Sequence, residues 1–402
     1  MAPIPEKRIV EFEKLGFGMF VHFGIYSIVG KGEWHRERHK VDKDEYGKLV
    51  NKFKIKKNWA KDLVATAKKA GAKYITLTTR HHDGFSLYDT CGLNEFDAVH
   101  SPTGRDLIRE FVDECRKADI VPFFYHTLLD WWKEEYKTDF SSYLQYLRDS
   151  VEILCKNYGK IGGLWFDGWW NKKDADWEFD KLYGLIRKYQ PDAMIINNTG
   201  LGELGQVSHK EIDSVTFERG KPSFVDCSEK YVAGEMCQVL NDHWGYAKND
   251  YNYKSIQTLI GDLIDCRRFN CNFLLNLGLR GDGSIRPLDK EMFNEIGNWV
   301  RANKNTIYAM HSADITAENA HILTDNKYYY AVISDVPMRA DANVQLEKGS
   351  IKTIHVDTDK KVVKAKWLDS GKKIAVKKNS FIGEPFCYGS SMGYRIARFE
   401  LK

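Results

Sequence analysis

Eight short apolar runs alternate with longer amphipathic stretches between Gly16 and about Asn303. Each run is too short for a helix, whereas the stretches between several of them carry apolar residues at helical spacing. This alternation is typical of repeated β–α units, so it predicts an α/β fold, a (β/α)8 or TIM barrel. The eight runs are residues 18–22, 74–78, 120–125, 163–166, 193–197, 214–217, 236–240 and 272–276.

The amphipathic stretches predict helices. The first of them stops at Gly71, a residue that commonly ends helices because it tolerates a left-handed backbone. No clear helical pattern separates the sixth apolar run from the seventh, so the sequence defines these two strands less well than the others. The predicted helices are residues 59–70, 106–118, 140–158, 178–189, 256–269 and 291–303.

Beyond His311 the sequence changes to short strands rich in Val, Ile, Tyr and Thr, separated by polar turns. The segments 327–333 and 393–401 are typical. This pattern predicts an antiparallel β-sandwich. We therefore expect a barrel domain over residues 1–310 and a C-terminal β-sandwich over residues 311–402, for which a chain of 402 residues suffices.

The charge balance argues against a nucleic-acid partner. The chain carries 60 basic and 56 acidic residues, a net charge of +4, without a long basic tract, so nucleic acid is not an expected partner. The first residues lack the apolar segment of a signal peptide, and no later segment offers about 18 uninterrupted apolar residues. We expect a soluble protein without a membrane contact, cytoplasmic unless a leader was removed, in which case it would be secreted.

The eight cysteines form no CxxC pair, which argues against a zinc site and a redox motif. Several lie in apolar contexts, such as Cys155 at the end of the run 151–155, and are expected to be reduced core residues. No metal and no cofactor are expected. The sequence leaves the oligomeric state open.

The segment 161–170 (IGGLWFDGWW) is an apolar run that ends in Asp167, next to glycine and several indoles. A buried parallel strand would deliver this carboxylate to the carboxyl end of the sheet, where α/β proteins bind ligands. The alternative is an Asp that only caps the following helix. Trp165, Trp169 and Trp170 favour a pocket, because indoles beside a carboxylate suit sugar binding.

Other polar side chains also gather at the predicted strand ends, which converge on one mouth of a barrel. Histidines, aromatics, amides and acids around one cavity suit recognition of a polyhydroxylated ring and hydrolysis of its glycosidic bond. These residues are His22, His81, His82, Asp83, Tyr125, His126, Asp130, Asn197, Asn198 and Glu218.

The His81–His82 pair raises the question of a metal. Adjacent strand residues point to opposite faces, so a shared metal is not expected, and one of the two histidines could be a hydrogen-bonded core residue. A metal hydrolase of the amidohydrolase type would also need an HxH motif after the first strand. Only His22 is present there.

Several segments together resemble the α-L-fucosidases of glycoside hydrolase family 29, in order from about Phe17 to Tyr308. The most specific are the HHDGF block at 81–85 and the WFDG block at 165–168. The resemblance implies a catalytic (β/α)8-like barrel followed by a β-sandwich, and a fucosylated oligosaccharide as substrate. The other matching segments are 18–24, 32–34, 74–80, 129–131, 243–246 and 272–278.

By this resemblance Asp167 is the nucleophile of a retaining double displacement on α-L-fucose. A second carboxyl must protonate the leaving oxygen and then activate water. Glu218, in Thr216-Phe217-Glu218, is similar to the T-x-E motif that carries this acid/base in several members. Glu235 resembles a second position used by other members. We prefer Glu218 and keep Glu235 as the alternative.

The resemblance also implies the residues that bind fucose. Trp244 would be an aromatic floor for the methyl group. Asn198 would take the place of an Arg found in many members, and with the segment 123–127 this resembles the subgroup that prefers α-1,3/1,4 linkages. The remaining candidates are His22, Glu33, Trp34, His81, His82, Tyr125, His126 and Trp165.

Two other functions remain open on the sequence. A non-catalytic fucose-binding protein would keep the pocket but not the chemistry, although Asp167 and two downstream glutamates speak against it. The second alternative is a glycosidase of other sugar specificity, either retaining or inverting. Without the resemblance, His22 would be interpreted as a barrel-interior histidine and Glu33 as a solvated loop acid.

Overall fold

The computed structural model describes residues 3–338 and 351–402. The chain divides into two compact units, Met1–Lys254 with Asn272–Asn294, and Ser255–Cys271 with Glu295–Lys402. The second unit thus takes in part of the segment predicted to belong to the barrel domain, and the boundary at residue 310 stays a prediction. Residues 339–350 of the predicted C-terminal domain lie outside the described residues.

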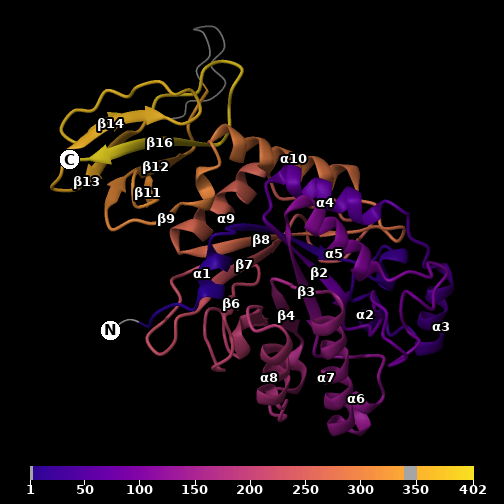
Figure 1. Cartoon of the computed structure of the whole chain (residues 1–402). Coiled ribbons are helices and arrows are strands. Elements are labelled where there is room, and N and C mark those ends of the chain that lie inside the picture. Colours follow the sequence, from indigo (N-terminus) through magenta and orange to yellow (C-terminus); the bar gives the residue numbers. More distant parts are fainter. Residues whose placement is uncertain (1–2, 339–350) are drawn as a thin grey trace. The chain divides into compact units, whose positions relative to one another are not determined.

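Eight parallel strands follow one another in chain order around a closed barrel, and β8 pairs with β1 (Figure 1). The predicted barrel is confirmed, and every predicted apolar run overlaps one strand. The strands are β1 (Phe17–His22), β2 (Tyr74–Arg80), β3 (Val121–Thr127), β4 (Gly163–Asp167), β5 (Met194–Asn197), β6 (Ser214–Thr216), β7 (Ala233–Val239) and β8 (Cys271–Gly278).

Five predicted helices, α4, α5, α7, α8 and α9, agree with the expected ranges to within one residue because their ends carry local signals, whereas the short helices α1, α2, α3 and α6 were not predicted. The Asp106 side chain caps the fifth helix by accepting a hydrogen bond from the backbone of Arg109 at 2.9 Å. Gly71 ends the fourth at φ 89°. The helices are α1 (Lys7–Glu13), α2 (His35–Arg38), α3 (Lys43–Gly47), α4 (Trp59–Ala70), α5 (Leu107–Ala118), α6 (Glu135–Thr138), α7 (Phe140–Asn157), α8 (Phe179–Tyr189), α9 (Ile256–Arg268) and α10 (Pro287–Ala302).

The last helix differs from its predicted range of 291–303. It begins four residues earlier, at Pro287. Proline suits the first turn of a helix, because its fixed φ is helical and the missing N–H would have no partner there.

In the described structure, the segments that connect β5 to β6 and β6 to β7 contain no α-helix. Only a short 3-10 turn, η4 (Asn198–Leu201), follows β5, and the segment 217–232 after β6 is irregular. The missing helical pattern between the sixth and seventh runs is thus confirmed. Both returning segments need another anchor to the barrel.

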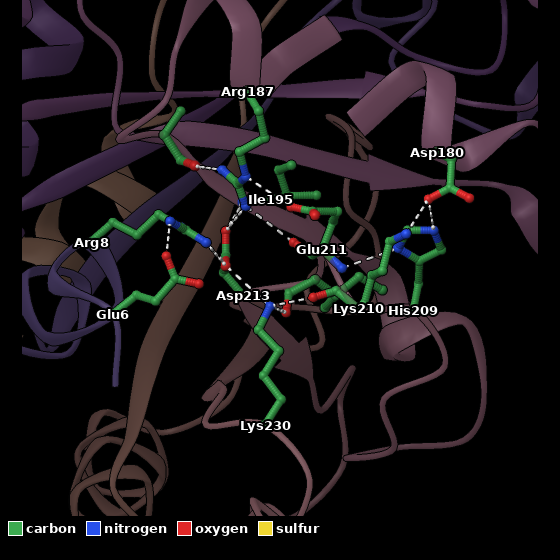
Figure 2. Close-up of polar contacts among 12 residues, drawn as sticks. Glu6, Arg8, Asp180, Arg187, Ile195, His209, Lys210, Glu211, Asp213 and Lys230 are labelled. Carbon is green, nitrogen blue, oxygen red and sulfur yellow. Dashed lines mark hydrogen bonds and ion pairs between the residues drawn. The ribbon is translucent and has the colours of Figure 1, made fainter. Parts of the chain in front are cut away.

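Figure 2 shows that anchor, a set of ion pairs around the buried carboxylate of Asp213, just before β6. The carboxylate lies 2.6 Å from Arg187 of α8 and 2.9 Å from Arg8 of α1. It also lies 3.5 Å from Lys230 and accepts a 2.9 Å hydrogen bond from the backbone of Ile195. The cluster therefore joins the ends of both irregular segments to β5, α1 and α8.

Large aromatic side chains fill the barrel interior. Every second residue of a strand points inward, so Phe20, Tyr74, Tyr125 and Trp165 lie in one core cluster, against which Phe12 of α1 also packs. A Cβ atom at Gly18 would lie 2.4 Å from the Tyr74 ring, so only glycine leaves that ring room. This packing gives the cavity above it a solid floor.

The second unit contains two antiparallel sheets, as the sequence predicted for its C-terminal part. Trp367, Phe381 and Phe399 are buried in the core that the sheets share. The strand order of the first sheet is β10 (Thr316–Glu318), β13 (Thr353–Asp357) and β15 (Ser380–Ile382). The strand order of the second sheet is β14 (Val362–Trp367), β16 (Tyr394–Leu401), β12 (Tyr329–Ser334), β11 (His321–Thr324) and β9 (His311–Ser312).

Among the described residues, every helix is too short or too polar to span a bilayer.

Candidate active site

A cavity of about 160 Å³ lies at the carboxyl ends of the barrel strands. It is smaller than the roughly 300 Å³ at which pockets for drug-sized ligands begin, so its size suits a single sugar ring. Its walls are mainly aromatic. The lining residues are Phe20, His22, Trp34, His81, His82, Tyr125, Trp165, Asp167, Trp170, Asn198, Glu218, Cys237 and Trp244.

Asp167 is the last residue of β4 and receives several hydrogen-bond donors. The Tyr125 hydroxyl donates to Oδ2 at 3.1 Å, and His82 Nε2 lies 3.5 Å from the same oxygen. Trp170 and Asn198 donate to Oδ1 at 3.3 and 3.2 Å. Burial acts to raise the pKa of Asp167, but these donors, His82 foremost, lower it to about 2. Asp167 is therefore a stable carboxylate at neutral pH.

The helix-capping alternative for Asp167 does not hold. The short turn that follows, η3 (Trp169–Lys172), begins after Gly168 and has no side-chain cap. The carboxylate oxygens of Asp167 instead face the cavity.

Glu218 lies on the other side of Asn198. The Asn198 side-chain nitrogen donates to Glu218 Oε2 at 2.7 Å and to Asp167 Oδ1 at 3.2 Å. These two oxygens therefore lie closer together than the roughly 6.5 Å at which the carboxyl separations of inverting glycosidases begin. Burial and the charge of Asp167 raise the pKa of Glu218. The surroundings thus lower the pKa of Asp167 and raise that of Glu218, the opposite shifts that a nucleophile and a proton donor need.

Glu235 is fully buried inside the barrel and does not line the cavity. Its carboxyl group accepts hydrogen bonds from the Tyr74 hydroxyl at 2.5 Å and from Trp165 Nε1 at 2.9 Å. Burial raises the pKa of Glu235 to about 7. The structure thus brings Glu218, but not Glu235, to the cavity beside Asp167.

His81 and His82 both line the cavity, contrary to the expectation that adjacent residues point to opposite faces. They follow the end of β2, where the alternation of a strand no longer applies. Their ring centroids lie 4.2 Å apart, and burial, followed by the charge of His82, lowers the pKa of His81. In the described residues, no three His, Cys, Asp or Glu side chains are grouped so that they could hold a metal ion.

His22 forms the wall beside Trp244. Its Nδ1 lies 2.6 Å from the side-chain oxygen of Asn276. Burial lowers the pKa of His22 to about 3, so the ring is neutral and keeps a nitrogen available to a ligand hydroxyl.

Indoles build the remaining walls. Trp34 stacks on Trp170 with ring centroids 5.9 Å apart, and Trp165 stacks on Tyr125 at 5.6 Å. Trp244 packs against the His22 ring at 5.3 Å. Such faces suit the apolar side of a sugar ring.

Two predicted binding residues do not line the cavity. Glu33 is buried and accepts a 2.7 Å hydrogen bond from the backbone of Gly245, so it joins the loops that carry Trp34 and Trp244. His126 follows Tyr125 on β3. Because Tyr125 points inward, His126 points outward, where its Nδ1 lies 2.8 Å from the carbonyl of Thr127.

Phe20 and Cys237 line the cavity although the sequence reasoning missed them, and Trp170 was noticed only as a neighbouring indole. Strand alternation could have found the first two. Phe20 lies two residues before His22 on β1, and Cys237 lies two residues after Glu235 on β7.

Comparison with known proteins decides the family. The sequence model of the family described as Alpha-L-fucosidase matches residues 5–305. The chain belongs to the α-L-fucosidase family. The resemblance and the enzyme class inferred from it, glycoside hydrolase, are thereby confirmed.

Relatives of this α-L-fucosidase family cover most of the chain. It is 26% identical to the tissue alpha-L-fucosidase of Bos taurus over 369 residues, which is 81% of this chain and 75% of that protein. The solved structure of alpha-L-fucosidase isoenzyme 1 from Paenibacillus thiaminolyticus has a TM-score of 0.87 and 29% identity, covering 98% of this chain and 99% of that one.

A third α-L-fucosidase, from Bacteroides thetaiotaomicron, was solved as a trapped covalent intermediate with 2-fluoro-fucosyl fluoride. Its TM-score is 0.85 at 23% identity, and the match covers 100% of this chain and 98% of that chain. At this identity the likeness shows the fold.

Proposed function

We propose that the chain hydrolyses terminal α-L-fucosyl linkages of oligosaccharides or glycoconjugates with retention of the anomeric configuration. The observation that carries this proposal is the Asn198 amide, which bonds to Asp167 and Glu218 together and keeps the two bonded oxygens closer than the carboxyl groups of an inverting pair. The aromatic cavity suits the fucose ring.

In the first step a carboxylate oxygen of Asp167 attacks the anomeric carbon of fucose. The bond from that carbon to the glycosidic oxygen breaks through an oxocarbenium-like transition state, and Glu218 gives its proton to the departing oxygen. The product of this step is a fucosyl ester of Asp167 together with the released alcohol.

In the second step Glu218 acts as a base. It takes a proton from water, the water oxygen attacks the anomeric carbon, and Asp167 leaves as a carboxylate. The charge of Asp167 contributes to the raised pKa of Glu218 in the free enzyme. That charge disappears in the ester, so the pKa of Glu218 falls when the residue must become a base.

The Bacteroides enzyme supports a covalent route, since its structure was trapped as a covalent intermediate. The fucose contacts are proposed from the cavity walls: His22, His81 and His82 offer hydrogen bonds to hydroxyls, and Trp244 offers an apolar face.

Two measurements test the function. Wild type should hydrolyse 4-nitrophenyl α-L-fucoside, and Asp167→Ala should lose nearly all turnover while still binding fucose. Proton NMR of the first-formed sugar should show α-L-fucose. A β-anomer as first product would remove the nucleophile assignment, and equal turnover by Asp167→Ala would favour a non-catalytic fucose-binding protein. Turnover of other aryl glycosides but not the fucoside would indicate another sugar specificity.

Two finer predictions accompany this function. A preference for α-1,3/1,4 linkages predicts faster release of fucose from 3-fucosyllactose than from 2′-fucosyllactose. A cytoplasmic location is supported by the eight cysteines, which are all free thiols. Fractionation of the source cells, followed by detection of the full chain, would test this location.

A further inference from the structure

Arg219 directly follows the proposed proton donor and is exposed. Its guanidinium lies over the ring of Trp244 at 5.0 Å, and its Nη2 donates to the carbonyl of Asp242 at 2.9 Å. Neither contact neutralises its charge. Within residues 3–338 and 351–402, no carboxylate forms an ion pair with Arg219. The side chain is thus held in place with donor groups to spare.

The backbone of Arg219 is also held in place. Its φ is 52°, a left-handed value that residues other than glycine adopt rarely. Its N–H donates to the carbonyl of Cys237 at 2.9 Å, and Cys237 lines the cavity. This bend lets Glu218 face the cavity while the next side chain lies on Trp244.

The charge of Arg219 reaches the cavity. Burial and Asp167 raise the pKa of Glu218, and Arg219 acts against them. Burial likewise raises the pKa of Glu33, and Arg219 again opposes the effect. Arg219 is not one of the residues that line the cavity, but it directly follows Glu218 and its guanidinium lies over the ring of the lining residue Trp244, which places it at the rim.

We propose that Arg219 forms a subsite for the leaving group and binds hydroxyl oxygens of the sugar to which fucose is attached. This inference rests on the proposed function, in which Glu218 protonates the glycosidic oxygen. The proton donor must lie beside that oxygen, so the residue that follows it on the rim reaches the first leaving-group sugar. A guanidinium only donates hydrogen bonds, so its ligand must offer acceptors. The favoured substrates are fucosylated oligosaccharides rather than fucosides of apolar alcohols.

The test compares 3-fucosyllactose with 4-nitrophenyl α-L-fucoside in two variants. Arg219→Asn removes the charge while keeping a residue that tolerates the left-handed backbone. Arg219→Lys keeps the charge, and Lys40 and Lys304 of this chain adopt the same backbone region. In Arg219→Asn, KM for the trisaccharide should rise about tenfold, as expected for loss of a charge-assisted hydrogen bond. KM for the aryl fucoside should not change.

The pH profile gives a readout that a merely structural role would not move. The charged or titratable groups that face Glu218 are Asp167, Glu33, Tyr125, Cys237 and Arg219. Without Arg219 the pKa of Glu218 rises, so the alkaline limb of kcat/KM for the trisaccharide moves to higher pH in Arg219→Asn. It should stay in place in Arg219→Lys.

Arg38→Asn is the matched control. Arg38 is exposed and lies over the cavity residue Trp34 at 5.1 Å, but it does not follow a carboxyl group of the cavity. Its variant should keep the KM values and the alkaline limb of the wild type.

Two results would overturn the subsite. One is an equal rise of KM for both substrates in Arg219→Asn, and the other is an unmoved alkaline limb. If thermal unfolding shows that Arg219→Asn is destabilised, Arg219→Lys decides. This variant keeps the charge, so its KM should match that of the wild type for both substrates. Acetylation of the substituted side chain should then raise KM for the trisaccharide, and an unchanged KM would contradict the subsite. Failure of the wild type to cleave either substrate would instead remove the proposed function itself.

Discussion

The side-chain amide of Asn198 lies 2.7 Å from the carboxylate of Glu218 and donates to Asp167 through the same nitrogen. A cation at this position would lower the pKa of both carboxyls strongly. A neutral amide orients the pair while leaving Glu218 with a raised pKa.

Asn198→Ala should therefore shift the whole pH profile. The Asn198 hydrogen bonds lower the pKa of both carboxyls, within environments dominated by burial. Their loss raises both pKa values, so the acidic and alkaline limbs of kcat/KM both move to higher pH. A hydrogen bond to a charged group contributes about 1.5–3 kcal/mol, so kcat/KM at the optimum should fall at least about tenfold.

The neighbouring Asn197→Ala is the control for this variant. Asn197 is buried and donates to the Tyr183 hydroxyl at 3.0 Å, away from the carboxyls. Its variant should lose stability but keep the limbs in place. Unmoved limbs in Asn198→Ala would contradict the bridging role.

Azide rescue distinguishes the two glutamates. In Glu218→Ala, kcat for a substrate with a poor leaving group should fall about 10²- to 10⁴-fold. With an aryl fucoside, azide should restore turnover and yield fucosyl azide, because a small anion can enter the space left by the side chain. Glu235→Ala should show no rescue, since its carboxyl is buried beneath Trp165. Rescue of Glu235→Ala alone would reverse the assignment.

Glu235 should also affect stability with a clear pH dependence. Its folded pKa of about 7 lies above the ordinary value of 4.5, so the folded state holds a proton that the unfolded state releases. The free energy of unfolding should therefore fall as pH rises from about 4.5 to 7, by about 1.4 kcal/mol per pH unit from this group.

Glu235→Gln removes that titration while an amide can still meet Tyr74 and Trp165. Urea unfolding at pH 5 and pH 8 should show that the free energy of unfolding falls less between these two pH values in this variant than in the wild type. An identical pH dependence in both proteins would mean that Glu235 is not the group responsible.

Asp213→Asn should destabilise the barrel. The change leaves Arg8, Arg187 and Lys230 without their buried partner (Figure 2), and loss of one member of a buried ion pair costs about 3–5 kcal/mol. Chemical unfolding measures the loss. Asp180→Asn breaks only the pairs of an exposed carboxylate with Lys210 and His209 and should change nothing measurable. Equal effects of the two variants would show that the cluster does not anchor the barrel.

Much of the fold could be predicted from the sequence because its signals are local. The apolar runs mark the strands, and Gly71 and Asp106 mark helix ends. Asp167 could be found because a strand that ends in a carboxylate delivers it to the barrel mouth. All of these features depend on residues close in the sequence.

Side-chain direction near strand ends could not be predicted in the same way. His81 and His82 face one cavity because β2 ends at Arg80. Glu235 belongs to β7, which begins at Ala233 rather than at the predicted residue 236. That places its carboxyl deep in the barrel, whereas Glu218 lies beyond the end of β6. A shift of a few residues in a strand boundary thus decides which glutamate reaches the cavity.

In the described chain no α-helix follows β5 or β6, so the two sides of the cavity have different structural supports and should tolerate sequence changes to different degrees. The side that we propose binds fucose is formed by strand ends locked into the packed interior, where a change of size disturbs many neighbours. The side of Asn198, Glu218 and Arg219 hangs on irregular segments tied down at their far ends. Such segments can change length or sequence without repacking a helix, so divergence of leaving-group preference among related chains should concentrate there.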